Sequence, residues 1–109
     1  MASEQRLVNY RDGRGREPFA VWHLKLADRR AQGRILARLN RLRAGNFGLC
    51  DSVGRGVFEL KIDYGPGYRV YFGRAGRSVV VLLCGGVKSS QVKDIETAKR
   101  HWELYKEAR

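Results

Sequence analysis

Basic and aromatic side chains alternate with apolar ones along residues 59–72. Successive side chains of a β-strand point to opposite faces, so such alternation separates an apolar face from a polar one. The polar positions include Lys61, Arg69 and Tyr71. Arginine and lysine bind phosphate groups, and an aromatic ring can stack on an unpaired base. The segment therefore predicts a cationic, aromatic sheet face suited to RNA.

The string Gly65-Pro66-Gly67 predicts a β-hairpin that would bring these side chains together. Glycine permits positive φ angles and proline fixes its own φ, which suits a tight turn between two alternating segments. On the two arms the apolar positions are Leu60, Ile62 and Tyr64, then Tyr68, Val70 and Phe72. We expect these residues to build a core on one face, while Lys61, Arg69 and Tyr71 are presented on the other.

The rest of the chain predicts the elements that hold this hairpin. Residues 5–10 suggest a short strand, and residues 12–18 a loop. Helical spacing begins at Phe19 and, after Asp28, continues in a second helix to about Arg43. A loop is expected through residue 56, followed by strands over residues 57–63, 68–73 and 78–84.

The last of these strands has no polar alternation, which predicts a central strand buried on both faces and broken by Gly85-Gly86. A final helix is expected after Ser89 or Ser90, with an inward stripe of Val92, Ile95, Ala98 and Trp102. The expected fold is one α+β domain over residues 1–109, ordered β-α-α-β-β-β-α. Its sheet is expected to be mainly antiparallel, with the helices packed on one face.

Composition narrows the class of partner. The chain has 22 basic and 11 acidic residues, a net charge of +11. Such an excess indicates an anionic partner. No apolar run is long enough to span a bilayer, and the first residues lack the apolar core of a signal peptide, so we expect a cytoplasmic protein without membrane contact. Two cysteines without zinc spacing, no carboxylate cluster and no phosphate-binding glycine motif predict no metal and no cofactor.

Three strings carry a resemblance to a known family: residues 38–48, residues 56–71 and residues 82–91. Together they resemble the RelE/ParE superfamily of bacterial toxins from toxin–antitoxin modules. Within it they are most similar to the HigB-like branch, often labelled phage-derived or addiction-module killer proteins. The resemblance covers roughly residues 17 to 105.

The resemblance implies a toxin that inhibits growth when it is freed from a cognate antitoxin. Most RelE-like and HigB-like members cut mRNA in the ribosomal A site without a metal, whereas ParE members inhibit DNA gyrase. The expected partners are thus mRNA, the ribosome and a helix-turn-helix, HigA-like antitoxin. Operator DNA would be contacted only through the toxin–antitoxin complex.

By the same resemblance, Lys61, Arg69 and Lys88 are the candidate catalytic residues. The chain departs from the pattern at Val87, where this branch often has aspartate. It also lacks a tyrosine or histidine early in the final helix, where Lys93 and Asp94 stand instead. The candidate RNA-binding residues are Tyr71, Lys93, Arg34, Arg38 and Arg41.

Metal-free RNA cleavage needs a base for the 2′-hydroxyl, cations for the phosphorane and an acid for the leaving 5′-oxygen. Arg69 suits the charge-stabilising role. Lys61 would be the base if its pKa is depressed, and otherwise holds phosphate or pairs with neighbouring acids. Lys88 would clamp phosphate or donate a proton, and Tyr71 would stack on a base or donate to phosphate.

The arginines at 34, 38 and 41 share one face of the second helix, which has six arginines between residues 29 and 43 and no acid. That face would contact the antitoxin, the ribosome or solvent. The primary functional hypothesis is a ribosome-dependent mRNA endonuclease. The alternatives are a ParE-like gyrase inhibitor and a decayed toxin that only binds nucleic acid.

Overall fold

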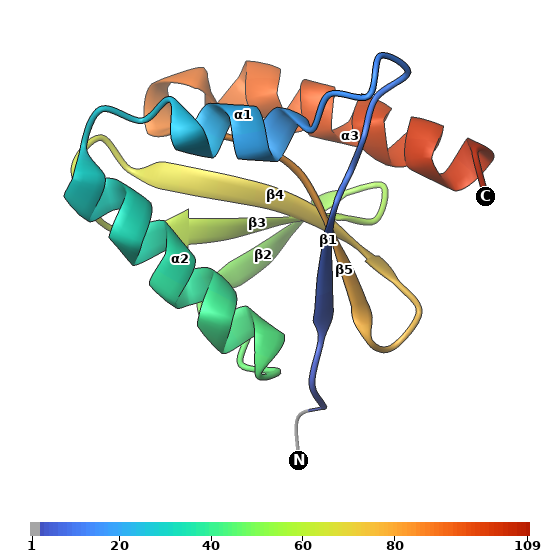
Figure 1. Cartoon of the computed structure of the whole chain (residues 1–109), viewed down its shortest axis with the longest axis horizontal. Helices are drawn as coiled ribbons and strands as arrows, with labels where there is room; N and C mark the ends of the chain where they lie inside the picture. Colours follow the sequence, from blue (N-terminus) through green and yellow to red (C-terminus); the bar gives the residue numbers. More distant parts are fainter. Residues whose placement is uncertain (1–2) are drawn as a thin grey trace.

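The computed structural model describes residues 3–109, so the first two residues of the expected domain lie outside the described residues. Five strands and three α-helices follow one another along the chain (Figure 1). Their bounds are β1 (Arg6–Asn9), α1 (Pro18–Leu24), α2 (Arg29–Arg43), β2 (Cys50–Gly54), β3 (Val57–Ile62), β4 (Tyr68–Ala75), β5 (Val79–Val87) and α3 (Gln91–Glu107). A single 3₁₀ turn, Lys88–Ser90, joins β5 to α3.

The five strands form one sheet in the order β1-β5-β4-β3-β2. The β1–β5 pair is parallel and the other three pairs are antiparallel, so the prediction of a mainly antiparallel α+β fold is confirmed. Strand β5 lies between β1 and β4, and residues 80–84 are buried as predicted for a central strand.

The prediction that Gly85-Gly86 would end the last strand is wrong, because β5 continues to Val87. A Cβ atom at Gly85 would collide with the Trp22 ring of α1, and one at Gly86 with the Asp94 carboxylate of α3. The two glycines therefore let helices approach the strand closely from either side, and they do not terminate it.

The helices cover both faces of the sheet, which corrects the prediction that they pack on one face. Helices α1 and α2 cover a core that contains Phe19, Ile35 and Val70, whereas α3 covers a second core that contains Tyr71, Ala98 and Trp102. Two of the hairpin positions expected to face outward, Arg69 and Tyr71, thus lie under α3. A β-bulge in β5 adds to this second core, because Leu83 and Cys84 both belong to it.

Strand β2 was not predicted, since residues 50–54 were expected to be a loop. Its sequence, Cys-Asp-Ser-Val-Gly, has little apolar content, but an edge strand needs only backbone pairing with its neighbour β3. Three consecutive residues with positive φ, Gly54, Arg55 and Gly56, then turn the chain into β3.

The helix boundaries follow local signals. Asp28 separates α1 from α2 and accepts hydrogen bonds from the backbone of Arg30 and Ala31, as an N-cap does. In α3, Ala98 and Trp102 are buried as predicted, but Val92 is 77% exposed. At about 100° per residue, Val92 lies roughly 80° to 120° around the helix from those two positions. Among residues 3–109, no helix is both long and apolar enough to cross a membrane.

Candidate functional site

Lys61 and Arg69 lie directly opposite each other on β3 and β4, and Arg69 lies opposite Gly86 on β5. These positions alternate with the core residues beneath α1 and α2, so both cationic side chains leave the sheet on the α3 side. Opposed residues on neighbouring strands have Cβ atoms about 5 Å apart. The sheet register therefore brings together the two strand cations that the sequence singled out.

Arg69, however, is neither exposed nor unpaired. Its side chain is 11% exposed, and Nη1 lies 3.2 Å from Oε1 of Glu59, whose side chain is 3% exposed. The guanidinium Nε is buried and has no hydrogen-bond partner among residues 3–109. The expectation of an exposed Arg69 is wrong because the first turn of α3 packs over this part of the sheet.

The Glu59 carboxylate gathers two further donors. The Tyr71 hydroxyl donates to Oε2 at 2.9 Å, and the Gln91 amide, from the first turn of α3, donates to the same oxygen at 2.8 Å. Burial, together with the hydrogen bond to Glu59, raises the pKa of Tyr71 well above its usual range. Tyr71 is fully buried, so its ring is not placed to stack on a base in this structure.

Lys61 remains accessible at the edge of this cluster. Its side chain is 42% exposed, and Nζ lies 3.2 Å from Oδ2 of Asp51 on β2. The acid that pairs with Lys61 is therefore on the neighbouring strand, and is neither Glu59 nor Asp63. An exposed pair of this kind contributes at most about 1 kcal/mol, so the ammonium group is free to exchange partners.

Lys88 and Lys93 are both exposed. Lys88 begins the 3₁₀ turn two residues after Gly86, and its Cβ lies 3.3 Å from the position that a Cβ on Gly67 would occupy. It therefore lies beside the β3–β4 turn, at the same end of the sheet as Lys61 and Arg69. Lys93 lies in the first turn of α3.

The three helix arginines, Arg34, Arg38 and Arg41, do not join this cluster. They line a cavity between α2 and the end of β3. The Arg38 guanidinium donates to the backbone carbonyl of Lys61, from the face of the sheet opposite the Lys61 side chain. The predicted basic residues thus fall into two groups on opposite faces of β3.

Glu59 and Gln91 were not predicted as members of the site. Strand alternation already placed Glu59 on the same face of the sheet as Arg69. The hairpin pattern alone, however, did not show whether Glu59 pairs with Arg69 or with Lys61. Gln91 could not be found in this way, because its contact spans 32 residues and depends on how α3 packs. Asp94, which the sequence already placed early in the final helix near the site, is hydrogen-bonded to Ser90 above Gly86.

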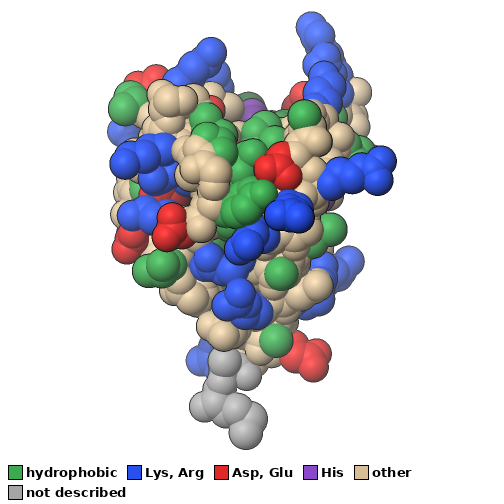
Figure 2. Space-filling model, turned by 90° about the vertical axis from the view of Figure 1, so that its left-hand side faces the viewer, with side chains coloured by type: hydrophobic (Ala, Val, Ile, Leu, Met, Phe, Trp, Pro, Cys, Tyr) green, Lys and Arg blue, Asp and Glu red, His purple; other side chains and the backbone are tan. Residues whose placement is uncertain are grey.

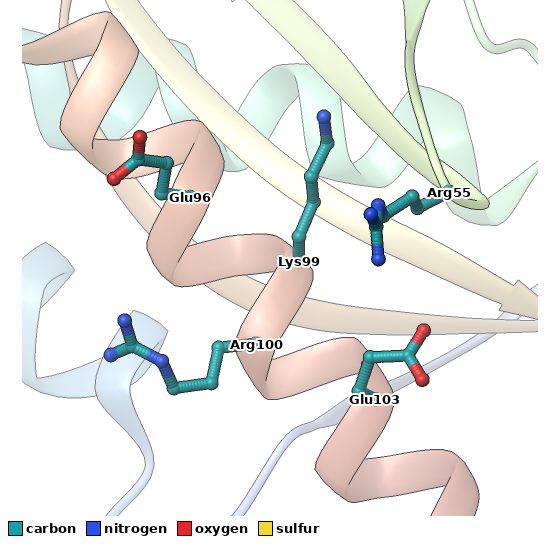
Figure 3. Close-up of a pocket in the computed structure, with 5 residues that line it drawn as sticks. All are labelled: Arg55, Glu96, Lys99, Arg100 and Glu103. Atoms are coloured by element: carbon teal, nitrogen blue, oxygen red, sulfur yellow. The ribbon is translucent and has the colours of Figure 1, made fainter.

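Another cavity lies between α3 and the β2–β3 turn. Figure 3 shows Lys99 of α3 and Arg55 of the β2–β3 turn extending toward the same space, with Glu96 and Glu103 on adjacent turns. Its mixed charges give no preference for a ligand of either sign. Across residues 3–109, no three His, Cys, Asp or Glu side chains are grouped in a way that could hold a metal ion.

Comparison with known proteins places the chain in a family. Residues 23–106 match the family model described as "Phage derived protein Gp49-like (DUF891)". A protein of Haemophilus influenzae described as uncharacterized is 53% identical over 81 residues, which are 74% of this chain and 82% of that protein. The chain therefore belongs to the Gp49-like family of phage-derived proteins, within the addiction-module killer and RelE-like toxin superfamily.

Proposed function

We propose that this protein is the toxin of a type II toxin–antitoxin module and that it cleaves mRNA on the ribosome without a metal. Membership of a toxin-like family supports the toxin role. The single observation that supports cleavage is the cross-strand pair of Lys61 and Arg69, with Lys88 at the same end of the sheet. Lys61 on β3, Arg69 on β4 and Lys88 just after β5 are three cations that can bind the oxygens of one phosphodiester group.

In the proposed reaction the 2′-oxygen attacks the adjacent phosphorus while the bond from phosphorus to the 5′-oxygen breaks. The 2′-hydroxyl proton passes to a base, and the leaving 5′-oxygen takes up a proton. The products are a 2′,3′-cyclic phosphate and a 5′-hydroxyl. Arg69 stabilises the charge of the phosphorane. Lys61 and Lys88 take the proton-transfer or phosphate-holding roles.

Glu59 acts in this proposal as a positioning residue. It is too buried to touch RNA, but its ion pair fixes the Arg69 guanidinium while 11% of the Arg69 side chain stays exposed. Tyr71 and Gln91 in turn fix Glu59. A guanidinium that is already fixed in place loses little conformational entropy when it binds a phosphate. This preorganisation favours stabilisation of the transition state.

Expression in bacterial cells and primer extension on a translated message test the proposal. We expect growth arrest and cuts within the reading frame. Lys61→Ala and Lys88→Ala should each reduce the cleavage rate, by about 10²-fold where the lost cation contacts the phosphorane. Arg69→Lys should also reduce cleavage while it keeps a partner for Glu59.

We call Lys61, Arg69 and Lys88 the cationic row. Arg77→Ala is the matched control, because Arg77 is exposed in the β4–β5 turn, outside this row. It should cleave like the wild type. Growth arrest with intact messages would contradict the proposal. If messages are cleaved, the dependence of the cleavage rate on pH in Lys61→Ala and Lys88→Ala assigns the base and the acid. The variant that lacks a proton-transfer group should lose either the acidic or the basic limb of the pH–rate profile.

A second candidate function is the ParE-like inhibition of DNA gyrase without RNA cleavage. It is favoured by the neutralised Arg69, the buried Tyr71 and the lack of a tyrosine or histidine in the first turn of α3. A supercoiling assay separates the two functions, because gyrase inhibition with unbroken messages supports the second. Under either function we propose a cytoplasmic toxin with a HigA-like antitoxin as its partner.

A further inference from the structure

Two cavities on the α2 side of the sheet are lined by residues that the proposed cleavage site does not use. The first has a volume of about 270 Å³ and lies between α2 and β3. The residues that line it are Arg34, Ala37, Arg38, Arg41, Ile62 and Asp63. It is a cationic hollow with an apolar floor at Ile62.

The second cavity has a volume of about 340 Å³ and opens beside β2. Phe47 and Phe58 give it an aromatic wall, and the fully buried Phe72 lies behind them, with its ring centroid 5.6 Å from that of Phe58. The Arg74 guanidinium lies 4.5 Å from the centroid of the Phe47 ring, at the rim. The remaining lining residues are Gly48, Cys50 and Ser52.

Arg38 joins the two cavities into one surface. It lines the first, and its Nη2 lies 3.0 Å from the position of a Cβ on Gly48, which lines the second. Its guanidinium is held by the backbone carbonyls of Lys61 and Leu49. We call the joined cavities the α2 groove. Figure 2, which views the side where α2 lies, shows Lys and Arg side chains gathered next to a strip of hydrophobic side chains.

The α2 groove has an unbalanced charge. Four arginines line it, at 34, 38, 41 and 74, against the single acid Asp63. Within residues 3–109, none of the four forms an ion pair within 4.0 Å. Burial, and then the nearby Arg41, lower the pKa of Arg38. An anionic ligand would relieve this repulsion, and it would gain most from Arg38, which is already fixed in place.

The aromatic half of the groove points to a peptide instead of RNA. In its wall only the Ser52 hydroxyl and the Cys50 thiol can hydrogen-bond through a side chain, apart from Arg74, so base edges would find few partners. Burial raises the pKa of the Cys50 thiol, so this group is neutral. The groove also opens on the face of β3 opposite the Lys61 side chain, so RNA at the cationic row would not pass through it.

We propose that the α2 groove binds an acidic segment of the antitoxin, with a large apolar side chain of that segment in the pocket lined by Phe47 and Phe58. The acidic residues of the segment would pair with the arginines of the cationic half. This inference rests on the proposed toxin function, because it names the partner of that toxin. It assigns the groove to inhibition and leaves the cationic row to the toxic activity.

Fluorescence anisotropy with three labelled probes tests the chemistry. The probes are a short acidic peptide containing leucine and phenylalanine, the same peptide with alanine at those positions, and a single-stranded RNA of equal charge. We expect the first probe to bind at least about tenfold more tightly than the second, because an apolar side chain buried in a pocket contributes more than 1.4 kcal/mol. Its binding should weaken with salt.

Arg41→Glu should weaken binding of the first probe about tenfold or more, and Phe58→Ala should remove its advantage over the alanine probe. Arg100→Glu on the outer side of α3 is the charge-matched control and should bind normally. Tighter binding of the RNA, with the same losses in these variants, would overturn the proposal and assign the groove to nucleic acid. No binding of the first probe would overturn it as well.

A test in cells distinguishes failure of this inference from failure of the proposed function. Arg74 and Ser52 line the aromatic half of the groove and lie outside the cationic row, so the variants tested are Arg74→Glu and Ser52→Glu. Each is co-expressed with the product of the reading frame adjacent to this gene. Both variants should cleave messages like the wild type, but that product should no longer neutralise them. Complete neutralisation of both would overturn the inference, whereas wild-type toxin without message cleavage would overturn only the proposed function.

Discussion

The two faces of the sheet treat arginine in opposite ways. Under α3, Arg69 is nearly buried and is neutralised by Glu59, which also accepts hydrogen bonds from Tyr71 and Gln91. On the α2 side, Arg34 and Arg41 lie in a groove with one acid and form no ion pair within the described chain. Arginine is therefore held in an internal ion pair on one face, where only 11% of the Arg69 side chain stays exposed, and has no such partner among residues 3–109 on the other.

This difference shows that the excess of basic residues is a poor guide to where an anion binds. A buried charge needs a partner inside the protein, because its desolvation is otherwise too costly. An exposed cation needs none, and it can exchange water for a ligand. Substitutions under α3 should consequently change the stability of the fold, and substitutions in the α2 groove should change binding.

Arg69→Ala should have the largest effect on stability. It leaves the Glu59 carboxylate buried without its counter-ion, which typically costs about 3–5 kcal/mol of unfolding free energy. Arg41→Ala in the groove should change stability by less than about 0.5 kcal/mol. Urea denaturation of both variants measures the contrast, and similar effects at the two sites would refute it.

Tyr71→Phe should come next, since it removes a buried hydrogen bond to a charged acceptor. Such a bond contributes about 1.5–3 kcal/mol. Tyr105→Phe is the control, because its hydroxyl accepts a hydrogen bond from Arg109 at the exposed end of α3. The same denaturation experiment should show little change for this control. A loss for Tyr105→Phe as large as that for Tyr71→Phe would count against the special role of the Glu59 cluster.

His101 offers a smaller test on the α3 face. Burial lowers its pKa below the ordinary value of 6.5, and the ring stacks on Tyr10. The folded state thus binds the proton less readily than the unfolded state. The resulting contribution to stability is present above pH 6.5 and is lost as the pH falls through the folded pKa.

Thermal unfolding between pH 7 and pH 5 measures this dependence. His101→Gln should flatten it. An unchanged slope in His101→Gln would show that other groups carry the acid sensitivity.

Arg41→Gln should have the smallest effect and the opposite sign. Arg38 and Arg41 are one helical turn apart on α2, and relief of their repulsion is expected to stabilise the helix by about 0.2–0.5 kcal/mol. The gain should appear at low salt and disappear at high salt, because added ions screen the repulsion. Stability that falls at low salt would mean that Arg41 has an internal partner.

Local patterns were enough to predict most elements of this fold. Helical spacing from Phe19 to Arg43 and the glycine-rich hairpin turn correspond to α1, α2 and the β3–β4 connection. Asp28, noted as an interruption, is the N-cap of α2. These features depend on residues close in sequence, and backbone preference and capping determine them.

The arrangement of layers was not predictable in the same way. Alternation in the hairpin suggested one buried and one open face, yet Tyr71 and Arg69 are covered by α3, which lies 20 or more residues further along the chain. An alternating strand with a polar second face can still be buried when that face carries a self-neutralising set such as Glu59, Arg69 and Tyr71. Strand β2 was not predicted for a related reason: an edge strand forms by backbone hydrogen bonds to its neighbour, here β3, and needs no apolar pattern of its own.

The parallel pairing of β1 with β5 has a consequence for synthesis of the protein. Arg6 pairs with Val79 and Asn9 with Leu82, so this edge of the sheet forms from segments more than 70 residues apart. During translation the first strand must wait until most of the chain has left the ribosome, and contacts of such long sequence separation form slowly. A newly made molecule therefore passes through an interval in which β1 has no partner strand at this edge of the sheet.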